Sequence, residues 1–343
     1  MKNVAVLVIN YNGKKYLDSC LKSLQSQTYK DFEVYLIDNG SSDGSVEYVR
    51  RNFPEVKIIK FDTNLGFAKA YNIAVNMVET KYVVFLNNDT IVDKEWLKNL
   101  YDEIVKDENI FAVGSKILLM DDKNRLHNAG SKIAPWGGGY DIGFLDYDRK
   151  CYNVKREVGA VCGASMIVRR DLFQKIGGFD DSFFAYFEDV DLCWRAWIYG
   201  YKVIYNPKSI VYHKLGGTWG RFENPRKIYF STRNRLFTLI KNFKSLSDIL
   251  KGILLSLPLD FLRVMFSLRN GNGHISYAIL KAYYNVISHL RDLFKKRREI
   301  QHNRVISDDY LKKKGLIAST AEFINFAYNF VKNVFLKSQS KPK

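Results

Sequence analysis

The feature that most constrains the fold is a regular alternation of apolar, β-branched runs with helix-like segments along residues 1–119. Strands that alternate with helices form βαβ units, and the crossovers of such units are right-handed. We therefore predict an α/β fold with a Rossmann-like, mostly parallel sheet flanked by helices. The expected strands are 4–9, 32–38, 56–61, 82–87 and 110–119, and the expected helices are 14–27, 44–53, 66–78 and 94–107.

The pattern loosens beyond the last of these strands and then returns. Residues 120–157 are rich in Gly and Asp, and they indicate an irregular insertion rather than a domain. A helix is expected at 188–200, followed by two short strands at 201–206 and 209–213.

After about residue 225 the chain becomes helical and strongly basic. Residues 226–343 hold 23 Lys/Arg against 7 Asp/Glu, which accounts for nearly all of the net charge of +17. Such asymmetry indicates an anionic partner, either a membrane surface or nucleic acid. Two apolar stripes recur here at helical spacing, and Pro258 is expected to interrupt the first. The stripes are Leu246, Ile249, Leu250, Ile253, Leu254 and Leu257, then Ile275, Ala278, Ile279, Ala282, Tyr283, Val286, Ile287 and Leu290.

These basic helices are expected to lie on a membrane rather than to cross it. Their apolar runs fall short of the ~20 residues that a spanning helix needs, and residues 315–331 are a borderline case with Glu322 in the middle. Basic amphipathic helices of this kind attach to anionic membrane surfaces. The alternative is that the stripes pack on the rest of the chain or on a second subunit. Nucleic acid ranks lower, because the aromatic side chains follow the apolar stripes.

Cysteine usage and the N-terminus indicate a reducing, cytoplasmic compartment. The four cysteines form no C-x-x-C pair, so neither a zinc ribbon nor a disulfide framework is indicated. The apolar stretch in "MKNVAVLVINYNG" is too short for a signal peptide.

Four polar stretches follow four consecutive predicted strands: "NYNG", "DNGSSDGS", "NLGFAKAYN" and "NNDT". Loops after parallel strands converge on one crevice, which is where open α/β sheets bind ligands. No G-x-G-x-x-G or P-loop pattern is present, so neither a dinucleotide fingerprint nor a Walker site is indicated. Asp38 ends a strand and is expected to accept a hydrogen bond from a ribose or a base, with Asn39 beside it. The following "SSDGS" fits a helix N-cap and a tight turn instead.

Two further stretches supply acid chemistry. Asp89, after an apolar strand, offers the carboxylate oxygen that Mg²⁺ or Mn²⁺ prefers. His213 ends a strand-like run and is a candidate second ligand, although a lone His is more often structural. Glu188, Asp189 and Asp191 lie among aromatic residues, which disfavour a carboxylate charge and suit a general base. The alternative is a helix N-terminus carrying acids that favour the helix dipole.

Together these motifs resemble glycosyltransferase family 2, the inverting enzymes of GT-A fold. The nucleotide-binding half is similar over "VLVINYNG", "SLQSQTYKDFEVYLIDNGSSDGS" and "NLGFAKAYN", and "FLNNDT" is similar to a D-x-D-type metal motif. The block "GASMIVRRDLFQKIGGFDDSFFAYFEDVDLCWRAWIYGY", followed by "VYH", resembles the acceptor half, most closely that of rhamnosyltransferase-like members. The resemblance implies a GT-A domain at 1–225, with a nucleotide-binding half at 1–116 and an acceptor half at 158–225. It leaves 226–343 as a basic helical region.

The resemblance also implies roles for individual residues. Asp189 falls on the catalytic base, and Asp89 and His213 fall on the metal site, which implies Mg²⁺ or Mn²⁺ as cofactor. The implied nucleotide-binding residues are Ile9, Tyr11, Asp38, Asn39, Asn64, Gly66, Phe67 and Asn88, and the implied supporting residues are Glu188, Asp191, Arg195, Arg233 and Arg235. The two last arginines are expected to reach phosphates of donor or acceptor.

The function implied is transfer of a sugar from a dTDP- or UDP-linked donor to a hydroxyl of a polyprenyl-linked or cell-surface glycan precursor, with inversion. The basic helices would hold the enzyme on the inner face of the cell membrane or form a homodimer, and nucleic acid is not an expected partner. A sugar-phosphate nucleotidyltransferase is the alternative enzyme, because it also sets acids at strand ends.

Overall fold

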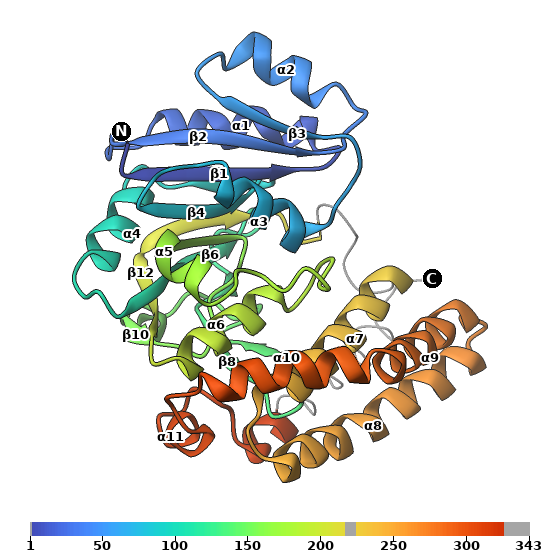
Figure 1. Ribbon diagram of the computed structural model, residues 1–343. Helices are drawn as coiled ribbons and strands as arrows, with labels where there is room; N and C mark the ends of the chain where they lie inside the picture. Colours follow the sequence, from blue (N-terminus) through green and yellow to red (C-terminus); the bar gives the residue numbers. More distant parts are fainter. Residues whose placement is uncertain (1, 217–223, 326–343) are drawn as a thin grey trace.

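The computed structural model describes residues 2–216 and 224–325 of the 343-residue chain (Figure 1). Within them the strands form one ten-stranded mixed sheet and a separate two-stranded sheet. In spatial order the main path of the large sheet is β10 (Arg156–Glu157), β12 (Lys202–His213), β6 (Ile110–Leu119), β11 (Ser165–Arg169), β4 (Tyr82–Asn87), β1 (Val4–Asn10), β2 (Phe32–Asn39) and β3 (Lys57–Phe61). The short strands β5 (Thr90–Val92) and β7 (Leu126–Asn128) pair with β12 and β6.

The N-terminal part follows the predicted alternation. Strands β3, β2, β1 and β4 are parallel neighbours, and their apolar side chains pack into hydrophobic cores on both faces of the sheet. The crossovers carry α1 (Lys14–Gln25), α2 (Ser45–Asn52) and α3 (Phe67–Asn76), and α4 (Trp96–Ile104) follows β5. The prediction of a mostly parallel α/β sheet flanked by helices is confirmed.

One strand prediction needs correction, and one strand was not predicted. The expected pair at 201–206 and 209–213 is one strand, β12, which pairs with β6 throughout and shifts register between Asn206 and Ile210. Pro207 lies in this irregularity, where a residue without an N–H donor is tolerated. β11 runs antiparallel to both β4 and β6, so it begins at the edge where β4 ends.

The stretch 120–157 is more regular than predicted. It contains β7, a hairpin of β8 (Ser131–Ile133) with β9 (Gly139–Asp141), a 3-10 turn η1 (Lys150–Tyr152) and β10. These strands have only two or three residues each, too short to leave a hydrophobic period in the sequence. Beyond β11 follow α5 (Arg170–Lys175) and α6 (Glu188–Ile198).

The C-terminal helices form a cluster on the side of the molecule opposite α2 and β3 (Figure 1). They are α7 (Pro225–Asn242), α8 (Leu246–Arg269), α9 (Gly273–Ser288), α10 (Leu290–His302) and α11 (Asp308–Lys313). The expectation that Pro258 interrupts the first stripe is wrong, because α8 continues through this residue. Pro258 lies at an exposed position of the helix. None of the described helices is long and apolar enough to cross a membrane. Residues 326–331 of the borderline segment lie outside the described residues.

Helix α7 carries a buried polar row toward the segment before α6. The Lys241 ammonium lies 2.5 Å from Asp180 and 3.0 Å from Asp191, and all three side chains are largely buried. Burial opposes charge on both acids, yet Lys241 with Lys296 lowers the pKa of Asp180, and Lys241 with Arg195 lowers that of Asp191. The three groups therefore form a buried, ionised cluster that joins α7 to α6.

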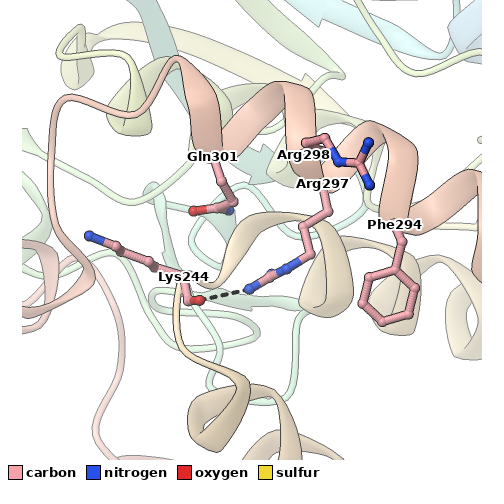
Figure 2. A pocket seen from close by; sticks show the side chains of 5 residues that line it. All are labelled: Lys244, Phe294, Arg297, Arg298 and Gln301. Atoms are coloured by element: carbon pink, nitrogen blue, oxygen red, sulfur yellow. Dashed lines mark hydrogen bonds between the residues drawn. The ribbon is translucent and has the colours of Figure 1, made fainter.

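Helix α10 closes the C-terminal end of α7. Arg297 donates to the carbonyl oxygens of Ile240 and Lys244, each at 2.7 Å. The first lies in the last turn of α7, where carbonyls have no partner within the helix, and the second lies just after the helix. Figure 2 shows this contact beside an open pocket of about 470 Å³. Its lining residues are Lys244, Phe294, Arg297, Arg298 and Gln301. None of them belongs to a loop after a sheet strand.

Replacing the buried Lys241 should destabilise the fold strongly. Lys241→Met leaves Asp180 and Asp191 without their shared ammonium, and we expect the free energy of unfolding to fall by about 3 kcal/mol or more. Because the folded-state pKa values of both acids are lowered, this difference should be present at neutral pH and shrink as the pH falls below the ordinary value of 3.8.

Urea unfolding at several pH values measures this effect. Lys98→Met is the matched control, because Lys98 and Asp102 form an exposed pair on α4. That variant should change the stability by less than about 0.5 kcal/mol. Equal effects of the two substitutions would contradict a structural role for the buried cluster.

Candidate active site

Asn10 ties together the polar ends of three neighbouring strands. The strand register places it opposite Asp38, and its Nδ2 donates to Asp38 Oδ1 at 3.2 Å and to Ser41 Oγ at 3.1 Å. Its Oδ1 accepts from Asn88 Nδ2 at 2.6 Å. The loops after β1, β2 and β4 therefore meet at one edge, as parallel strands require. Asn10 begins the "NYNG" stretch, but no role was predicted for it.

Asp38 and Asn39 shape the loops around them. Both are buried, at 0% and 3% exposure, so neither presents a side-chain atom to solvent. The Asn39 amide donates to Asn64 Oδ1 at 3.0 Å and to the Gly66 carbonyl at 3.2 Å. Both side chains were predicted to contact the nucleotide. In the structure both form hydrogen bonds that hold the loops in place. By contrast, Tyr11 is 40% exposed at the same edge.

The pairing of β5 with β12 brings Asp89 and His213 together across 124 positions of sequence. The register sets His213 opposite Thr90, and His213 Nε2 lies 3.1 Å from Asp89 Oδ1. The Asn87 Nδ2 atom lies 3.4 Å from the same ring nitrogen. Both predicted metal ligands are nearly buried, at 5% and 8% exposure, so their functional atoms face each other at the edge of the sheet.

A second histidine, which the sequence analysis missed, contacts the first. The Nδ1 atoms of His127 and His213 are 2.9 Å apart, so one of them carries the proton and the other accepts it. Burial, with the charges of His213 and Lys227, lowers the pKa of His127 to about 3, so this ring is neutral. The contact couples the tautomers of the two rings, because only one of the facing Nδ1 atoms carries a proton. It lies on the three-residue strand β7, and no motif marks it.

Asp189 lies in the first turn of α6, where the backbone orients it. Its carboxylate accepts hydrogen bonds from the N–H groups of Gly163 and Val190, each at 2.8 Å. Burial outweighs these bonds and raises the pKa of Asp189 above its ordinary value. The neighbouring Glu188 is more deeply buried, and burial with the charge of Asp189 raises its pKa well above the usual range. Of the two acids, Glu188 therefore has the stronger tendency to keep its proton.

The loop before α6 has a backbone that few sequences adopt. Tyr186 and Phe187 both have positive φ, at 72° and 65°, although neither is glycine. Such residues persist only where the surroundings hold them, and they cluster at functional sites. Asn234 of α7 supplies the restraint, because its Nδ2 donates to the carbonyls of Ala185 and Tyr186 at 2.8 Å each.

A short series of contacts joins the Asp189 region to the Asp89 region. The N–H of Asn87 donates to the carbonyl of Ala164 at 3.1 Å, one residue from the Gly163 that binds Asp189. The N–H of Phe67 donates to the carbonyl of Phe184 at 2.7 Å, so the loop after β3 also reaches the segment before α6. Because β11 starts where β4 ends, the acids of both halves lie at the same edge of the sheet.

The four predicted supporting residues other than Glu188 lie behind this edge, in the packing between helices. Arg195 donates to Asp191 and to the carbonyls of Ile176 and Gly178. Arg233 donates to the Ser182 carbonyl at 2.6 Å and stacks over aromatic rings of α7. Contact of Arg233 and Arg235 with phosphates of donor or acceptor stays a prediction.

Arg235 pairs with a carboxylate of another helix. Its guanidinium bonds Asp260 of α8 and is 8% exposed. A cation at this depth is kept by a partner of its own, which leaves it directed at the helix interface rather than at the sheet edge.

A further acid belongs to the same region and was not predicted. Asp141, at the end of β9, accepts hydrogen bonds from Asn128 at 2.8 Å and Ser131 at 2.7 Å. Burial and the charge of Asp189 raise its pKa to about 6. The same surroundings raise the pKa of the Cys162 thiol well above its usual range, so Cys162 is not a reactive thiolate.

The residues present fit a divalent cation that arrives with anionic ligands of its own. Among residues 2–216 and 224–325, no group of three or more His, Cys, Asp or Glu side chains is placed to hold a metal ion. Asp89 and His213 offer one carboxylate oxygen and one ring nitrogen, which Mn²⁺ accepts, and Mg²⁺ accepts the oxygen. A cation here would take its remaining ligands from phosphate oxygens and water.

Residues 5–177 match the family described as Glycosyl transferase family 2. The chain belongs to this family. A curated relative, N-acetylglucosaminyl-diphospho-decaprenol L-rhamnosyltransferase of Mycobacterium tuberculosis, is 25% identical over 245 residues, which cover 63% of this chain and 77% of the relative. This likeness agrees with the resemblance to rhamnosyltransferase-like members of the family.

Solved structures give the same fold. GalNAc-T7 with UDP, GalNAc and Mn²⁺ superposes with a TM-score of 0.58 at 19% identity, over 70% of this chain and 48% of that one. The mannosyltransferase PcManGT from Pyrobaculum calidifontis, in complex with GDP-Man and Mn²⁺, gives 0.52 at 15% identity, over 83% and 87%. The sheet of this family 2 protein is thus the GT-A fold, as predicted, and this chain spans about half of GalNAc-T7.

The contact between the loop after β3 and the segment before α6 can be tested at Gly66. This residue has φ 81° and ψ 175°, a region essentially restricted to glycine, and a Cβ would lie 2.6 Å from the Phe184 carbonyl oxygen. Gly66→Ala should lower the free energy of unfolding by about 2 kcal/mol or more.

Gly177→Ala is the control, measured in the same urea titrations. Gly177 also has positive φ, at 85°, but no atom lies within 4 Å of its added Cβ. Only backbone strain remains there, so the expected loss is about 1 kcal/mol. Losses of the same size at both positions would argue against the close contact at Phe184.

Proposed function

We propose that this family 2 protein is an inverting, metal-dependent glycosyltransferase that moves a sugar from a nucleoside-diphosphate donor to a hydroxyl group. The observation that carries the proposal is the convergence of two acid sites at one edge of the sheet. Asp89 with His213 and Asp189 with Gly163 are joined through the Asn87–Ala164 hydrogen bond. One of these sites suits a leaving diphosphate and the other suits an incoming hydroxyl.

Asp189 is the proposed general base. The two N–H groups that hold its carboxylate fix its direction, and burial raises its pKa, which makes it a better proton acceptor than an ordinary carboxylate. It takes the proton of the acceptor hydroxyl while that oxygen forms a bond to the anomeric carbon. The bond from this carbon to the diphosphate oxygen breaks, and the sugar is transferred with inverted configuration. Burial and the charge of Asp189 raise the pKa of Glu188, which opposes a second charge beside the base.

Asp89 and His213 are the proposed ligands of Mg²⁺ or Mn²⁺, which would supply positive charge to the departing diphosphate. In this role the ring orientation of His213 is set by His127 on its far side, through the 2.9 Å contact of their Nδ1 atoms. Outer partners of this kind fix the orientation of ligating histidines. Asn88 is held by Asn10 beside this pair and keeps the loop after β4 in place.

The nucleotide is proposed to lie over the loops after β1 and β3. Tyr11 offers an exposed ring for the base, and the backbone of Gly66 and Phe67 borders the path toward Asp189. Asp38 and Asn39 would act through the loops that they hold. We propose a uridine or deoxythymidine diphosphate sugar as donor. The name of the Mycobacterium relative suggests rhamnose as the sugar.

The proposed acceptor is a polyprenyl-linked or cell-surface glycan precursor, used at the inner face of the cell membrane. The name of the Mycobacterium relative, which acts on N-acetylglucosaminyl-diphospho-decaprenol, supports a lipid-linked acceptor. In this proposal residues 1–225 carry the reaction, with the nucleotide over 1–116 and the acceptor over 158–225. Residues 226–343 place the enzyme near its acceptor.

Asp189→Asn should abolish transfer and leave nucleotide binding intact. The amide keeps the shape of the carboxylate but accepts no proton, so turnover should fall by a hundredfold to ten-thousandfold, about the worth of a general base. The assay incubates UDP- and dTDP-sugars with a polyprenyl-diphosphate-linked sugar and detects the released nucleoside diphosphate, while calorimetry measures nucleotide affinity.

Asp181→Asn is the matched control, because Asp181 is an exposed acid of the same segment. It should keep the activity of the unaltered protein. Full activity of Asp189→Asn would remove Asp189 as the base. Release of pyrophosphate from a nucleoside triphosphate and a sugar phosphate would instead identify a nucleotidyltransferase.

Removal of one proposed metal ligand should uncouple nucleotide binding from the metal. In thermal unfolding with UDP or dTDP, added Mn²⁺ should raise the melting temperature of the unaltered protein. Asp89→Ala should weaken the Mn²⁺ response by about tenfold or more in metal concentration. Asp102→Ala, at an exposed position on α4, should respond like the unaltered protein. A response to Mn²⁺ that survives Asp89→Ala and His213→Ala would refute this metal site.

A further inference from the structure

Helix α8 exposes a continuous apolar stripe along its whole length. The stripe members recur every three or four residues, so they share one face of the helix. They are between 41% and 66% exposed, whereas the buried residues of α8, such as Ile249 and Ser256, lie on another face. The stripe consists of Leu246, Leu250, Leu254, Leu257, Phe261, Met265 and Leu268.

Helix α9 repeats this arrangement beside α8. One of its faces packs on α7 through Ile275, Ile279 and their neighbours. Another face carries an exposed stripe, 59% to 72% exposed, made of Tyr277, Leu280, Tyr284 and Ile287. An apolar surface of this extent is unusual on a protein that leaves it to water, and it marks a docking surface. We call the two stripes together the α8–α9 face.

The charges around the α8–α9 face are of one sign. Asp248 pairs with Lys312 at 2.8 Å, and Asp260 bonds Arg235, so both acids of α8 are neutralised from other helices. Lys251 and Arg269 are exposed and lie 18 residues apart, five helical turns, so they share one line beside the stripe. Lys281 is exposed beside the stripe of α9.

We propose that the α8–α9 face docks on an anionic lipid bilayer, with its apolar side chains inserted among the headgroups and the upper acyl chains. A bilayer interface offers an apolar layer bordered by anionic groups, which matches apolar stripes bordered by Lys and Arg. A second copy fits less well, because a two-fold interface on this face would set the same cations against one another.

The contacts of α7 carry this docking to the candidate active site. One side of α7 receives the buried face of α9, and another side holds the loop before Asp189 through Asn234. The docked face and the active-site loop thus share a single helix as support. Docking would hold the site at a set distance from the bilayer, where a lipid-linked acceptor resides. This last step rests on the proposed function, whereas the docking itself does not.

Vesicle co-sedimentation of the full chain tests the docking. The unaltered protein should bind vesicles of phosphatidylcholine with phosphatidylglycerol, and bind pure phosphatidylcholine more weakly. Leu254→Asp with Phe261→Asp places two charges in the apolar stripe, and the partition coefficient should fall by about tenfold or more. Both side chains are exposed, so the melting temperature should stay the same.

The matched control places the same two charges at exposed apolar residues elsewhere. Met77→Asp with Val154→Asp, at 59% and 56% exposure, should bind vesicles like the unaltered protein. Equal binding by the Leu254/Phe261 double variant would overturn the proposal. So would an unaltered protein that is a dimer in solution and becomes monomeric in that variant. Asp189→Asn should bind vesicles normally, which separates a failure of docking from a failure of the proposed reaction.

Discussion

The hydrogen bonds from Asn234 to the carbonyls of Ala185 and Tyr186 hold a turn that the local sequence disfavours. Two consecutive non-glycine residues with positive φ cost on the order of 1–3 kcal/mol each, and only firm surroundings keep them in place. The ion cluster of Lys241, about two helical turns after Asn234 on α7, adds a second restraint. The direction of Asp189 therefore depends on a helix that follows it in sequence by some fifty positions.

This dependence explains which parts of the molecule could be predicted from sequence. The strands and helices of the first half were predictable, because each is a local pattern with its own hydrophobic period. The edge at which Asp89 lies was also predictable, because the carboxyl ends of parallel strands share one edge. The position of Asp189 at that edge did not follow from this rule, because β11 runs antiparallel and Asp189 lies on a helix after it. The contact of His213 with His127 was not predictable, because it depends on how β12 and the short strand β7 align on either side of β6.

Three residues that were expected at a ligand have protein partners of their own. Asp38, Arg233 and Arg235 were expected at a ligand because polar groups near a site usually serve it. In the structure Asp38 accepts from Asn10, Arg233 donates to the Ser182 carbonyl and Arg235 donates to Asp260. A buried polar side chain without a partner costs more than the ligand contact would return, so the fold uses such residues first. Sequence patterns do not show which polar residues are needed for this purpose.

The C-terminal helices have one face whose side chains find partners and one face whose side chains are exposed. Lys241 of α7 is buried beside its partners Asp180 and Asp191, and the acids of α8 are matched by Lys312 and Arg235. Among the described residues, the apolar side chains of the α8–α9 face have no counterpart of this kind, although burial of each would stabilise the protein by about 1.5–3 kcal/mol. Within the described residues these two apolar stripes stay exposed, so the free energy of burying them would come from a surface outside this part of the chain. Lipid provides such a surface without a specific register between side chains, which suits stripes built mainly of Leu and aromatic residues.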